Sequence, residues 1–167
     1  NGQMAQDYDP DKFYYLDDVY NNEPERDKKL VVHSHEPFNA ETPKELIHQN
    51  HITPNNLWYV RNHHPTPDVK PEKYRLKLYH KKLLIKTLTL DEIKKLPKKK
   101  IITTMQCGGN RRGEFDNTSG TQWDIGAIST AEWEGVPLHQ LLDYETEHIH
   151  FTGYDGVKVS IPFKKGA

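Results

Sequence analysis

The chain has 167 residues and a net charge of −1 at neutral pH, with 34% hydrophobic and 28% charged residues. These values suit one domain with a modest core, and they argue against a general electrostatic attraction to nucleic acid or to an anionic membrane. No apolar run approaches the roughly 18 residues that a membrane-spanning helix needs. The single cysteine, Cys107, excludes an intrachain disulfide and any site built from several cysteines.

Acidic side chains are frequent in residues 1–30, and apolar periodicity is weak there. This composition is typical of a polar tail or an interdomain linker. We therefore predict that the compact domain occupies residues 31–167.

Helix and strand signals alternate irregularly through the compact part. Three motifs have the form of a capping box, with Ser or Thr followed three residues later by Glu, and they predict helix starts at Thr42, Thr89 and Ser129. Alternating or β-branched runs predict strands at residues 74–78 and 101–105, and a hairpin made of residues 148–152 and 157–161. This mixture predicts an α+β fold rather than a doubly wound sheet.

The segment Tyr59-Val60-Arg61-Asn62-His63 is the first that could carry chemistry. The guanidinium of Arg61 offers a rigid fork of donors for an oxyanion, and His63 could donate to a phosphate or bind a metal. The alternative is an ordinary surface loop that follows a short strand.

The second segment runs from Cys107 to Arg112, with Gly108, Gly109 and Asn110 between them. Glycines allow backbone N–H groups to approach a ligand closely, and neighbouring arginines favour the thiolate form of a cysteine. The alternative is a buried cysteine that precedes a turn.

The third segment places Trp123 before a small-residue turn and the helix predicted to start at Ser129. The N-terminus of a helix suits an anion. The alternative is a packed tryptophan beside an ordinary helix.

Two pairs of histidines alternate along predicted strands, His33 with His35 and His148 with His150. This spacing can present two imidazoles to one zinc ion. Neither pair has a cysteine or carboxylate companion nearby in the sequence, so we interpret both pairs as incidental.

Taken in order, these motifs resemble the molybdenum-cofactor domain of eukaryotic sulfite oxidases, which plant-type nitrate reductases share. The resemblance covers about residues 30–163. The shared blocks are Phe38-Asn39-Ala40-Glu41, Ile52-Thr53-Pro54-Asn55, Arg61-Asn62-His63 and Gln106-Cys107-Gly108-Gly109-Asn110-Arg111-Arg112, followed by Trp123, Gly126-Ala127-Ile128-Ser129 and Trp133.

This resemblance implies a molybdenum–molybdopterin cofactor, with haem only in a separate domain or partner. Cys107 matches the cysteine that binds molybdenum. The catalytic residues implied are Arg61, Cys107, Arg112 and Trp123, and the cofactor-binding residues are Tyr59, Val60, Arg61, Asn62, His63 and Asp155.

The implied reaction is oxidation of sulfite to sulfate by oxygen-atom transfer, with electrons passed to cytochrome c or to a cytochrome b5-like haem domain. The run Tyr-Val-Arg-Asn-His keeps a nitrate reductase-type domain open as an alternative. A non-catalytic truncated relative that acts as a structural subunit is another. The resemblance also implies the mitochondrial intermembrane space for an animal source, or a peroxisome for a plant source, and a homodimer only for the full-length family member.

Three departures from the family pattern bear on these expectations. Gly108 stands where the family usually has alanine, a change that we expect to be sterically permissive. The stretch between Arg112 and Trp123 is a few residues short. The sequence ends about halfway through the usual cofactor domain, so we expect an N-terminal part that is incomplete as a catalyst.

Overall fold

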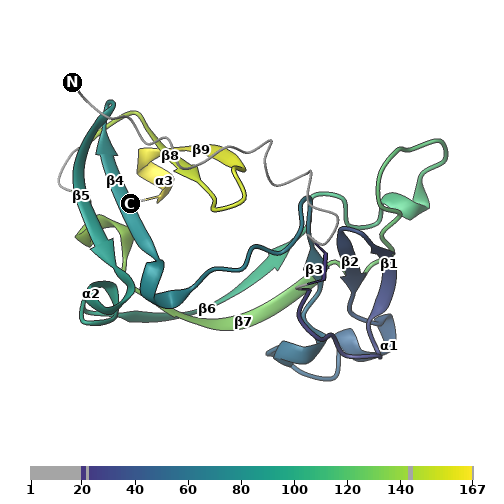
Figure 1. Cartoon of the computed structure of the whole chain (residues 1–167). Helices are drawn as coiled ribbons and strands as arrows, with labels where there is room; N and C mark the ends of the chain where they lie inside the picture. The colour runs from purple at the N-terminus through teal and green to yellow at the C-terminus, as the bar shows by residue number, and fades with distance from the viewer. Residues whose placement is uncertain (1–19, 22, 143–144, 167) are drawn as a thin grey trace. The chain divides into compact units, whose positions relative to one another are not determined.

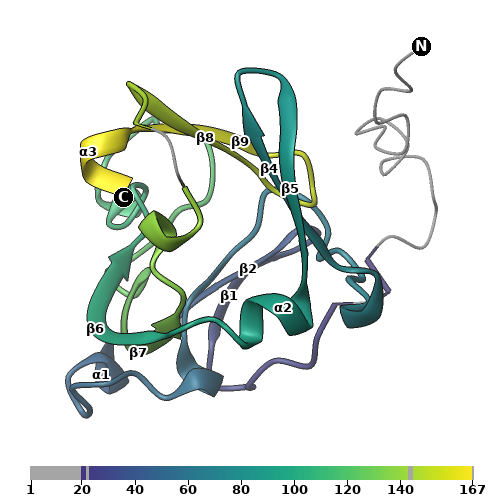
Figure 2. The same ribbon diagram turned by 90° about the vertical axis from the view of Figure 1, so that its left-hand side faces the viewer.

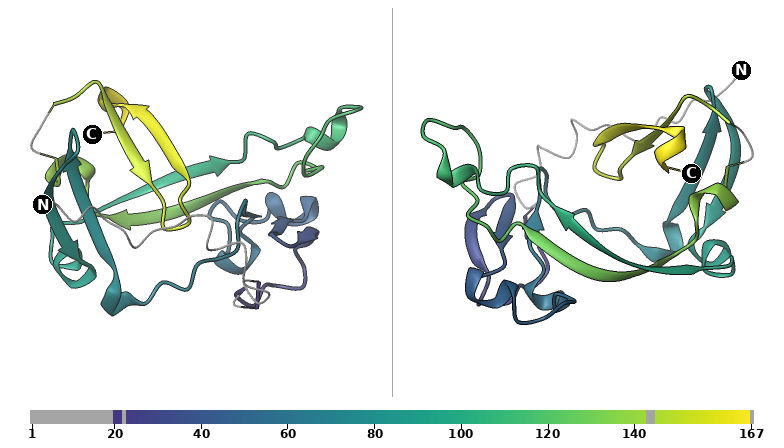
Figure 3. Two further views of the ribbon diagram at one scale, coloured as in Figure 1. Left: turned by 45° about the horizontal axis from the view of Figure 1, so that its top comes forward. Right: turned by 180° about the vertical axis from the view of Figure 1, so that it is seen from behind.

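The computed structural model describes residues 20–21, 23–142 and 145–166. They belong to two compact units, the first built from residues up to Pro67 and from Ile102–Glu132, the second from Asp68–Ile101 and the residues from Trp133 onward. The division falls within β6 (Lys99–Gln106) and β7 (Ile128–Gly135), which pair as a two-stranded sheet (Figures 1 and 3). Short helices and strands are mixed throughout, which confirms the predicted α+β class.

A three-stranded antiparallel sheet organises the first unit, in the order β1 (Val31–His35), β2 (Phe38–Glu41) and β3 (Val60–Arg61) (Figure 1). The register places Asn39 opposite Arg61 and Ala40 opposite Val60. The helix α1 (Lys44–Ile47) follows β2, and a 3-10 turn at Asn55–Leu57 leads into β3. This register brings the side chain of Asn39 next to Arg61.

Two buried clusters form the core of the first unit. One contains Leu30, Phe38 and Ala40, with Val60 packed against it. The other contains Tyr59, Trp123 and Ala127, with Trp58 and Cys107 packed against it. Because successive side chains of an extended segment point to opposite faces, the neighbours Tyr59 and Val60 serve different clusters.

Two hairpins organise the second unit. The first pairs β4 (Arg75–His80) with β5 (Leu83–Thr89) and continues into α2 (Leu90–Lys94) (Figure 2). The second pairs β8 (His148–Thr152) with β9 (Lys158–Pro162) and continues into α3 (Phe163–Gly166). The strands predicted at 74–78 and 101–105 and the predicted hairpin are thus confirmed, with boundaries that differ by one or two residues at most of their ends.

The three predicted capping boxes have three different outcomes. Thr89 and Glu92 form the complete reciprocal box at the start of α2. At Thr42 the helix α1 forms nearby, but the predicted cap is wrong, because the Thr42 hydroxyl donates to the carbonyl of Leu57 at 2.7 Å. At Ser129 the predicted helix is wrong, because the residue lies within β7.

Tertiary partners explain the strand at Ser129. The buried Ser129 hydroxyl accepts a hydrogen bond from the backbone N–H of Tyr59 at 3.3 Å. The next residue, Thr130, donates its N–H to the hydroxyl of Thr53 at 3.1 Å. The Ser129 hydroxyl thus bonds to a distant backbone group, and the residue lies in a strand, so the anion-binding helix N-terminus that we predicted after Trp123 is wrong.

Among the residues that the structure describes, no helix combines the length and the apolar character that crossing a membrane requires.

Candidate functional site

Cys107 lies directly after β6 and is half-buried. Its backbone N–H donates to the carbonyl of Ala127 at 2.9 Å, and the N–H of Gly109 donates to its Sγ at 3.3 Å. The turn after β6 therefore fixes the position of the sulfur and directs a backbone donor at it.

Tyr59 packs in the same buried cluster as Trp123, and Cys107 packs against it. Burial raises the pKa of the Tyr59 phenol, and the nearby charge of Cys107 raises it further. Tyr59 therefore keeps its proton at neutral pH and can act as a hydrogen-bond donor beside the cysteine.

Trp123 is fully buried, and its indole Nε1 has no hydrogen-bond partner. The ring of His33 meets it edge-on, with the ring centroids 5.0 Å apart. A buried donor without a partner costs free energy, so it marks a place where a ligand or an ordered water would complete the site.

A buried carboxylate that the sequence analysis did not single out holds the segment after Trp123. Both side-chain oxygens of Glu41 accept from the backbone N–H of Asp124, at 3.0 and 3.3 Å, and His33 Nε2 lies 3.5 Å from Glu41 Oε1. Burial raises the pKa of Glu41, and His33 partly opposes that shift. The carboxylate companion that His33 lacked in the sequence is supplied by the adjacent strand β2, so strand pairing was the missing signal.

Arg111 and Arg112 have different surroundings. Arg111 forms a two-pronged ion pair with Glu114, with both N···O distances at 2.7 Å. Arg112 is half-buried, donates to the carbonyl of Thr121 at 3.1 Å, and pairs with no carboxylate of the described residues. Arg112 is therefore the arginine of the pair that keeps an uncompensated charge.

Two glycines make room for the Arg112 guanidinium. A Cβ at Gly109 would lie 2.7 Å from its Nη2, and a Cβ at Gly120 would lie 2.9 Å from its Nη1. The N–H of Gly109 also faces Cys107, so the arginine adjoins the cysteine turn. Gly109 and Gly120 therefore allow the arginine to pack closely against the backbone, and Gly109 also directs its N–H at the cysteine.

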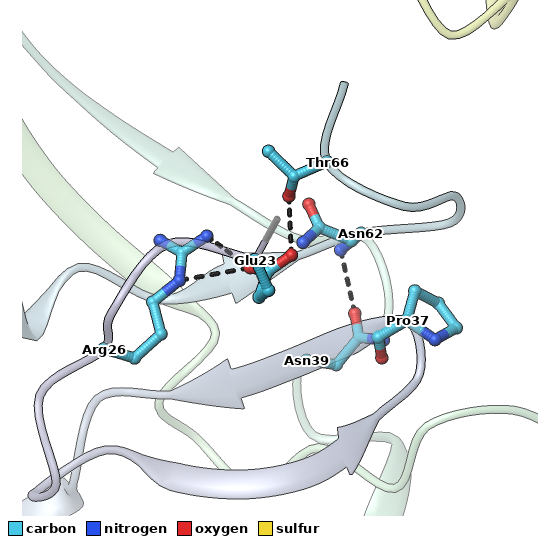
Figure 4. Close-up of polar contacts among 6 residues, drawn as sticks. All are labelled: Glu23, Arg26, Pro37, Asn39, Asn62 and Thr66. Carbon is cyan, nitrogen blue, oxygen red and sulfur yellow. Dashed lines mark hydrogen bonds and ion pairs between the residues drawn. The ribbon is translucent and has the colours of Figure 1, made fainter. Parts of the chain in front are cut away.

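A groove of about 360 Å³ runs along the segment from Trp58 to Asn62. Its polar lining includes Arg61 and Asn62, and both are held by the buried Asn39. The Asn39 Oδ1 accepts from the N–H of Asn62 at 2.9 Å (Figure 4) and from Arg61 Nη1 at 3.4 Å. The Nδ2 of Asn62 is buried without a partner.

The two remaining members of the predicted cradle differ in exposure. Val60 is half-buried and lines the same groove while packing against the core. His63 is exposed, and its ring meets that of His64 edge-on at 4.8 Å between centroids.

Asp155 belongs to the second unit and lies in the turn between β8 and β9. Its Oδ1 accepts from the N–H of Val157 at 3.2 Å, and the N–H of Gly153 donates to the carbonyl of Val157 at 2.8 Å. These bonds give Asp155 a structural role in the turn. Its predicted role toward a cofactor stays a prediction.

The first-unit residues fit the chemistry of an anionic metal–pterin group. They offer one soft sulfur ligand in Cys107, the cations Arg61 and Arg112, and two buried donors without partners in Trp123 and Asn62. Soft thiolates suit metals that also carry sulfur ligands, and guanidiniums suit anionic groups. In the described part of the chain, no three His, Cys, Asp or Glu side chains gather as a metal site.

Comparisons with known proteins give the family of the chain. Residues 63–167 match the family described as "Oxidoreductase molybdopterin binding domain". The chain is 40% identical over 153 residues to "Sulfite oxidase, mitochondrial" of Rattus norvegicus, covering 83% of this chain and 27% of the rat protein. It is 37% identical over 111 residues to nitrate reductase (NADH) 1 of Nicotiana tabacum, covering 64% of this chain and 12% of that protein.

The fold also has a counterpart among solved structures. The sulfane dehydrogenase SoxCD from Paracoccus pantotrophus aligns with a TM-score of 0.62 at 20% sequence identity, over 99% of this chain and 44% of that one. At this identity the likeness concerns the fold alone. The chain spans only about a quarter (27%) of the length of the rat relative. The family match covers residues 63–167, which is more than half of this chain. On that match, the chain belongs to the oxidoreductase molybdopterin binding domain family.

Proposed function

We propose that this chain forms part of a sulfite oxidase-type oxidoreductase that uses a molybdenum–molybdopterin cofactor. The observation that carries the proposal is the gathering of Cys107, Tyr59 and Trp123 in one buried cluster. Next to the cysteine turn lies Arg112, which pairs with no carboxylate of the described residues. Family membership supports the cofactor, and the sulfite oxidase relatives support sulfite as the substrate.

Cys107 would be the protein's ligand to molybdenum. Its thiolate is soft, and the Gly109 N–H would lower the negative charge on the sulfur without competing for the metal. When bound, the molybdenum–pterin group supplies the two-electron redox chemistry that converts sulfite to sulfate.

The arginines would bind and orient the substrate. Sulfite is a dianion at high pH and a monoanion at low pH, so a pocket with Arg61 and Arg112 would hold it by charge-assisted hydrogen bonds. The buried face of Trp123 would exclude water, and its free Nε1 would supply a further donor. Fixed cations beside the reacting anion act as preorganised electrostatics.

The segment Tyr59–His63, with Asp155, would cradle the pterin. The groove beside Arg61 and Asn62 supports this part of the proposal, because pterin edges present both donors and acceptors and Asn62 has an unused donor there. The neutral phenol of Tyr59 would add a donor beside the metal ligand.

The electron acceptor would be cytochrome c or a cytochrome b5-like haem domain, with haem held outside this chain. The word mitochondrial in the names of the animal relatives supports a mitochondrial location, for which we propose the intermembrane space. A homodimer is proposed for the longer family members only.

A nitrate reductase-type domain is the second candidate, because the tobacco enzyme matches 64% of the chain at 37% identity. The sulfite oxidase matches extend further, to 83% of the chain. Two assays distinguish the candidates: a sulfite oxidase reduces cytochrome c when sulfite is supplied, and a nitrate reductase produces nitrite from nitrate. A chain that holds the cofactor but supports neither reaction would favour a non-catalytic structural subunit.

The test of the proposal is molybdenum content, measured by elemental mass spectrometry on protein produced together with the cofactor pathway. We expect Cys107→Ser to reduce molybdenum per chain by about tenfold or more, in line with the loss of a metal's protein ligand. The matched control is Gly108→Ala, because a Cβ at that neighbouring position meets no atom within 4 Å. Equal molybdenum in the wild type and Cys107→Ser would show that Cys107 is not the ligand.

A further inference from the structure

The groove beside Arg61 is also lined by Arg26, a residue that the sequence analysis placed in the N-terminal tail. Neither the motifs nor the resemblance singled it out. Its presence brings a second guanidinium to a groove that already contains Arg61, from a segment more than 30 residues away in the sequence.

The side chain of Arg26 is held in place. Its Nε and Nη2 donate to Glu23 Oε1, at 3.2 and 2.6 Å. The other oxygen of Glu23 accepts from the hydroxyl of Thr66 at 2.7 Å (Figure 4). The guanidinium of Arg26 also lies over the ring of Phe38, with Cζ 5.6 Å from the ring centroid. A cation fixed in this way loses little side-chain entropy when it binds a ligand.

Donors remain for a ligand on both guanidiniums. Arg26 Nη1 has no hydrogen-bond partner among the described residues, since its contacts to Glu23 use Nε and Nη2. Toward the described residues, Arg61 donates only from Nη1, to Asn39 and to the carbonyl of Asn62. Its Nε and Nη2 have no hydrogen-bond partner in that part of the chain.

The rest of the lining offers several donors, and none of the described residues contributes a carboxylate to it. Asn55 and Asn62 contribute amides, and Trp58 and Tyr59 contribute stacked rings with centroids 6.1 Å apart. Glu23 forms an ion pair with Arg26 and offsets part of its charge, but Glu23 is not among the residues that line the groove. Two guanidiniums with no competing acid suit a tetrahedral oxyanion, which accepts bonds from several N–H groups at once.

We propose that Arg26 is a further ligand-binding residue, which clamps a tetrahedral oxyanion together with Arg61 in this groove. The source of the oxyanion rests on the proposed function. It is either the phosphate ester of the bound pterin cofactor or free sulfate, the product. Glu23 and Thr66 act as positioning residues for Arg26.

The variants are Arg26→Gln, which removes the charge, and Arg26→Lys, which keeps the charge but loses the planar fork. The matched control is Lys28→Gln, which removes one positive charge from an exposed position two residues away. Circular dichroism shows whether each variant is folded, and Arg26→Lys decides the question if Arg26→Gln is not.

The first measurement is calorimetric titration of the cofactor-free protein with sulfate, and the second is molybdenum per chain after production with the cofactor pathway. We expect Arg26→Gln to weaken sulfate binding about fivefold or more, Arg26→Lys to lie between, and Lys28→Gln to stay within about twofold of the wild type. If molybdenum content falls about threefold or more as well, the groove holds the cofactor's phosphate. If only sulfate affinity falls, it holds the free oxyanion.

The proposal is overturned if sulfate affinity and molybdenum content in both Arg26 variants equal those of Lys28→Gln, or if the wild type binds neither sulfate nor molybdenum. A wild type that binds sulfate but acquires no molybdenum would count against the proposed function alone. The sulfate titration then still decides the role of Arg26.

Discussion

Gly108 and Gly126 both lie near Cys107, but their surroundings differ greatly. At Gly108 an added Cβ meets nothing within 4 Å, and the backbone does not have the positive φ that disfavours side chains. At Gly126 an added Cβ would lie 2.0 Å from the carbonyl oxygen of Thr42. The N–H of Thr42 donates to the carbonyl of Gly126 at 3.2 Å, so the two backbones are fastened together at this point.

We therefore expect opposite effects of alanine at these two positions. Gly108→Ala should raise the free energy of unfolding by about 0.4–1 kcal/mol, because it restricts the unfolded chain at no steric cost. Gly126→Ala should lower it by roughly 3 kcal/mol or more, because backbone must move to admit the methyl group. Urea unfolding of the three proteins measures both changes. Equal stability of the two variants would contradict the close approach at Gly126.

Glu41 gives the stability a pH dependence of defined sign. Its pKa in the folded protein is raised from the ordinary value of 4.5 by burial; His33 opposes this shift, the charge of Asp124 adds to it, and the backbone N–H of Asp124 opposes it. The folded state therefore binds a proton more readily than the unfolded chain. The contribution of this group to stability is largest below the ordinary pKa and is lost as pH rises through the folded-state pKa.

Glu41→Gln should remove this dependence. We expect the variant to gain stability relative to the wild type at neutral pH and to match it near about pH 4, since a neutral amide avoids the cost of burying a charge. Urea unfolding across this pH range measures the difference. The control is Glu45→Gln, which neutralises an exposed carboxylate nearby. A wild-type pH dependence in Glu41→Gln would refute the assignment.

At the scale of elements, local motifs predicted structure well where no distant partner competed. The complete capping box at Thr89 follows β5 in an exposed setting, and its hydrogen bonds are all local. The same pattern failed as a cap at Thr42 and as a helix start at Ser129. There the hydroxyls bond to groups 15 and 70 residues away in the sequence. Those contacts exist only in the folded chain, and sequence periodicity carries no signal for them.

The hairpin of β8 and β9 and the strand β4 were predictable for the same reason. The turn at Gly153–Gly156 and the alternation in β4 are local features, and both structures formed at the predicted places. The pairing of β2 with β3 is not local, because about 20 residues separate the strands. Only that pairing reveals that Asn39 organises Arg61 and Asn62.

At the scale of the whole molecule, the resemblance selected site residues that the first unit brings together, namely Cys107, Tyr59 and Trp123, with Arg112 beside the cysteine turn. It did not select Glu41, His33 or Arg26. Strand pairing brings Glu41 and His33 together, and the folding of the N-terminal segment places Arg26 at the groove beside Arg61. Asp155 lies in the other unit, a division that no motif in the sequence marks.

The start of the domain is the remaining question of organisation. We predicted it at residue 31, yet residues before that position contact the first unit. Leu30 is buried with Phe38 and Ala40, and Glu23 bonds to Thr66. The side chain of Asp27 accepts from the backbone N–H of Lys29 and from the amide of Asn56, and these two bonds lower the pKa of Asp27.

Two deletions test where the fold begins. Removing residues 1–22 should leave the melting temperature within about 2 °C of the wild type, because their acidic composition offers little to a core. Removing residues 1–30 should lower it by about 3–12 °C, since burying one leucine is worth about 1.5–3 kcal/mol and each kcal/mol moves the midpoint by about 2–4 °C. Leu30→Ala in the full chain separates the apolar contribution from the polar contacts at Glu23 and Asp27. Equal melting temperatures for the two deletions would place the boundary at residue 31, as the composition predicts, and would show that the contacts of residues 23–30 add nothing measurable to stability.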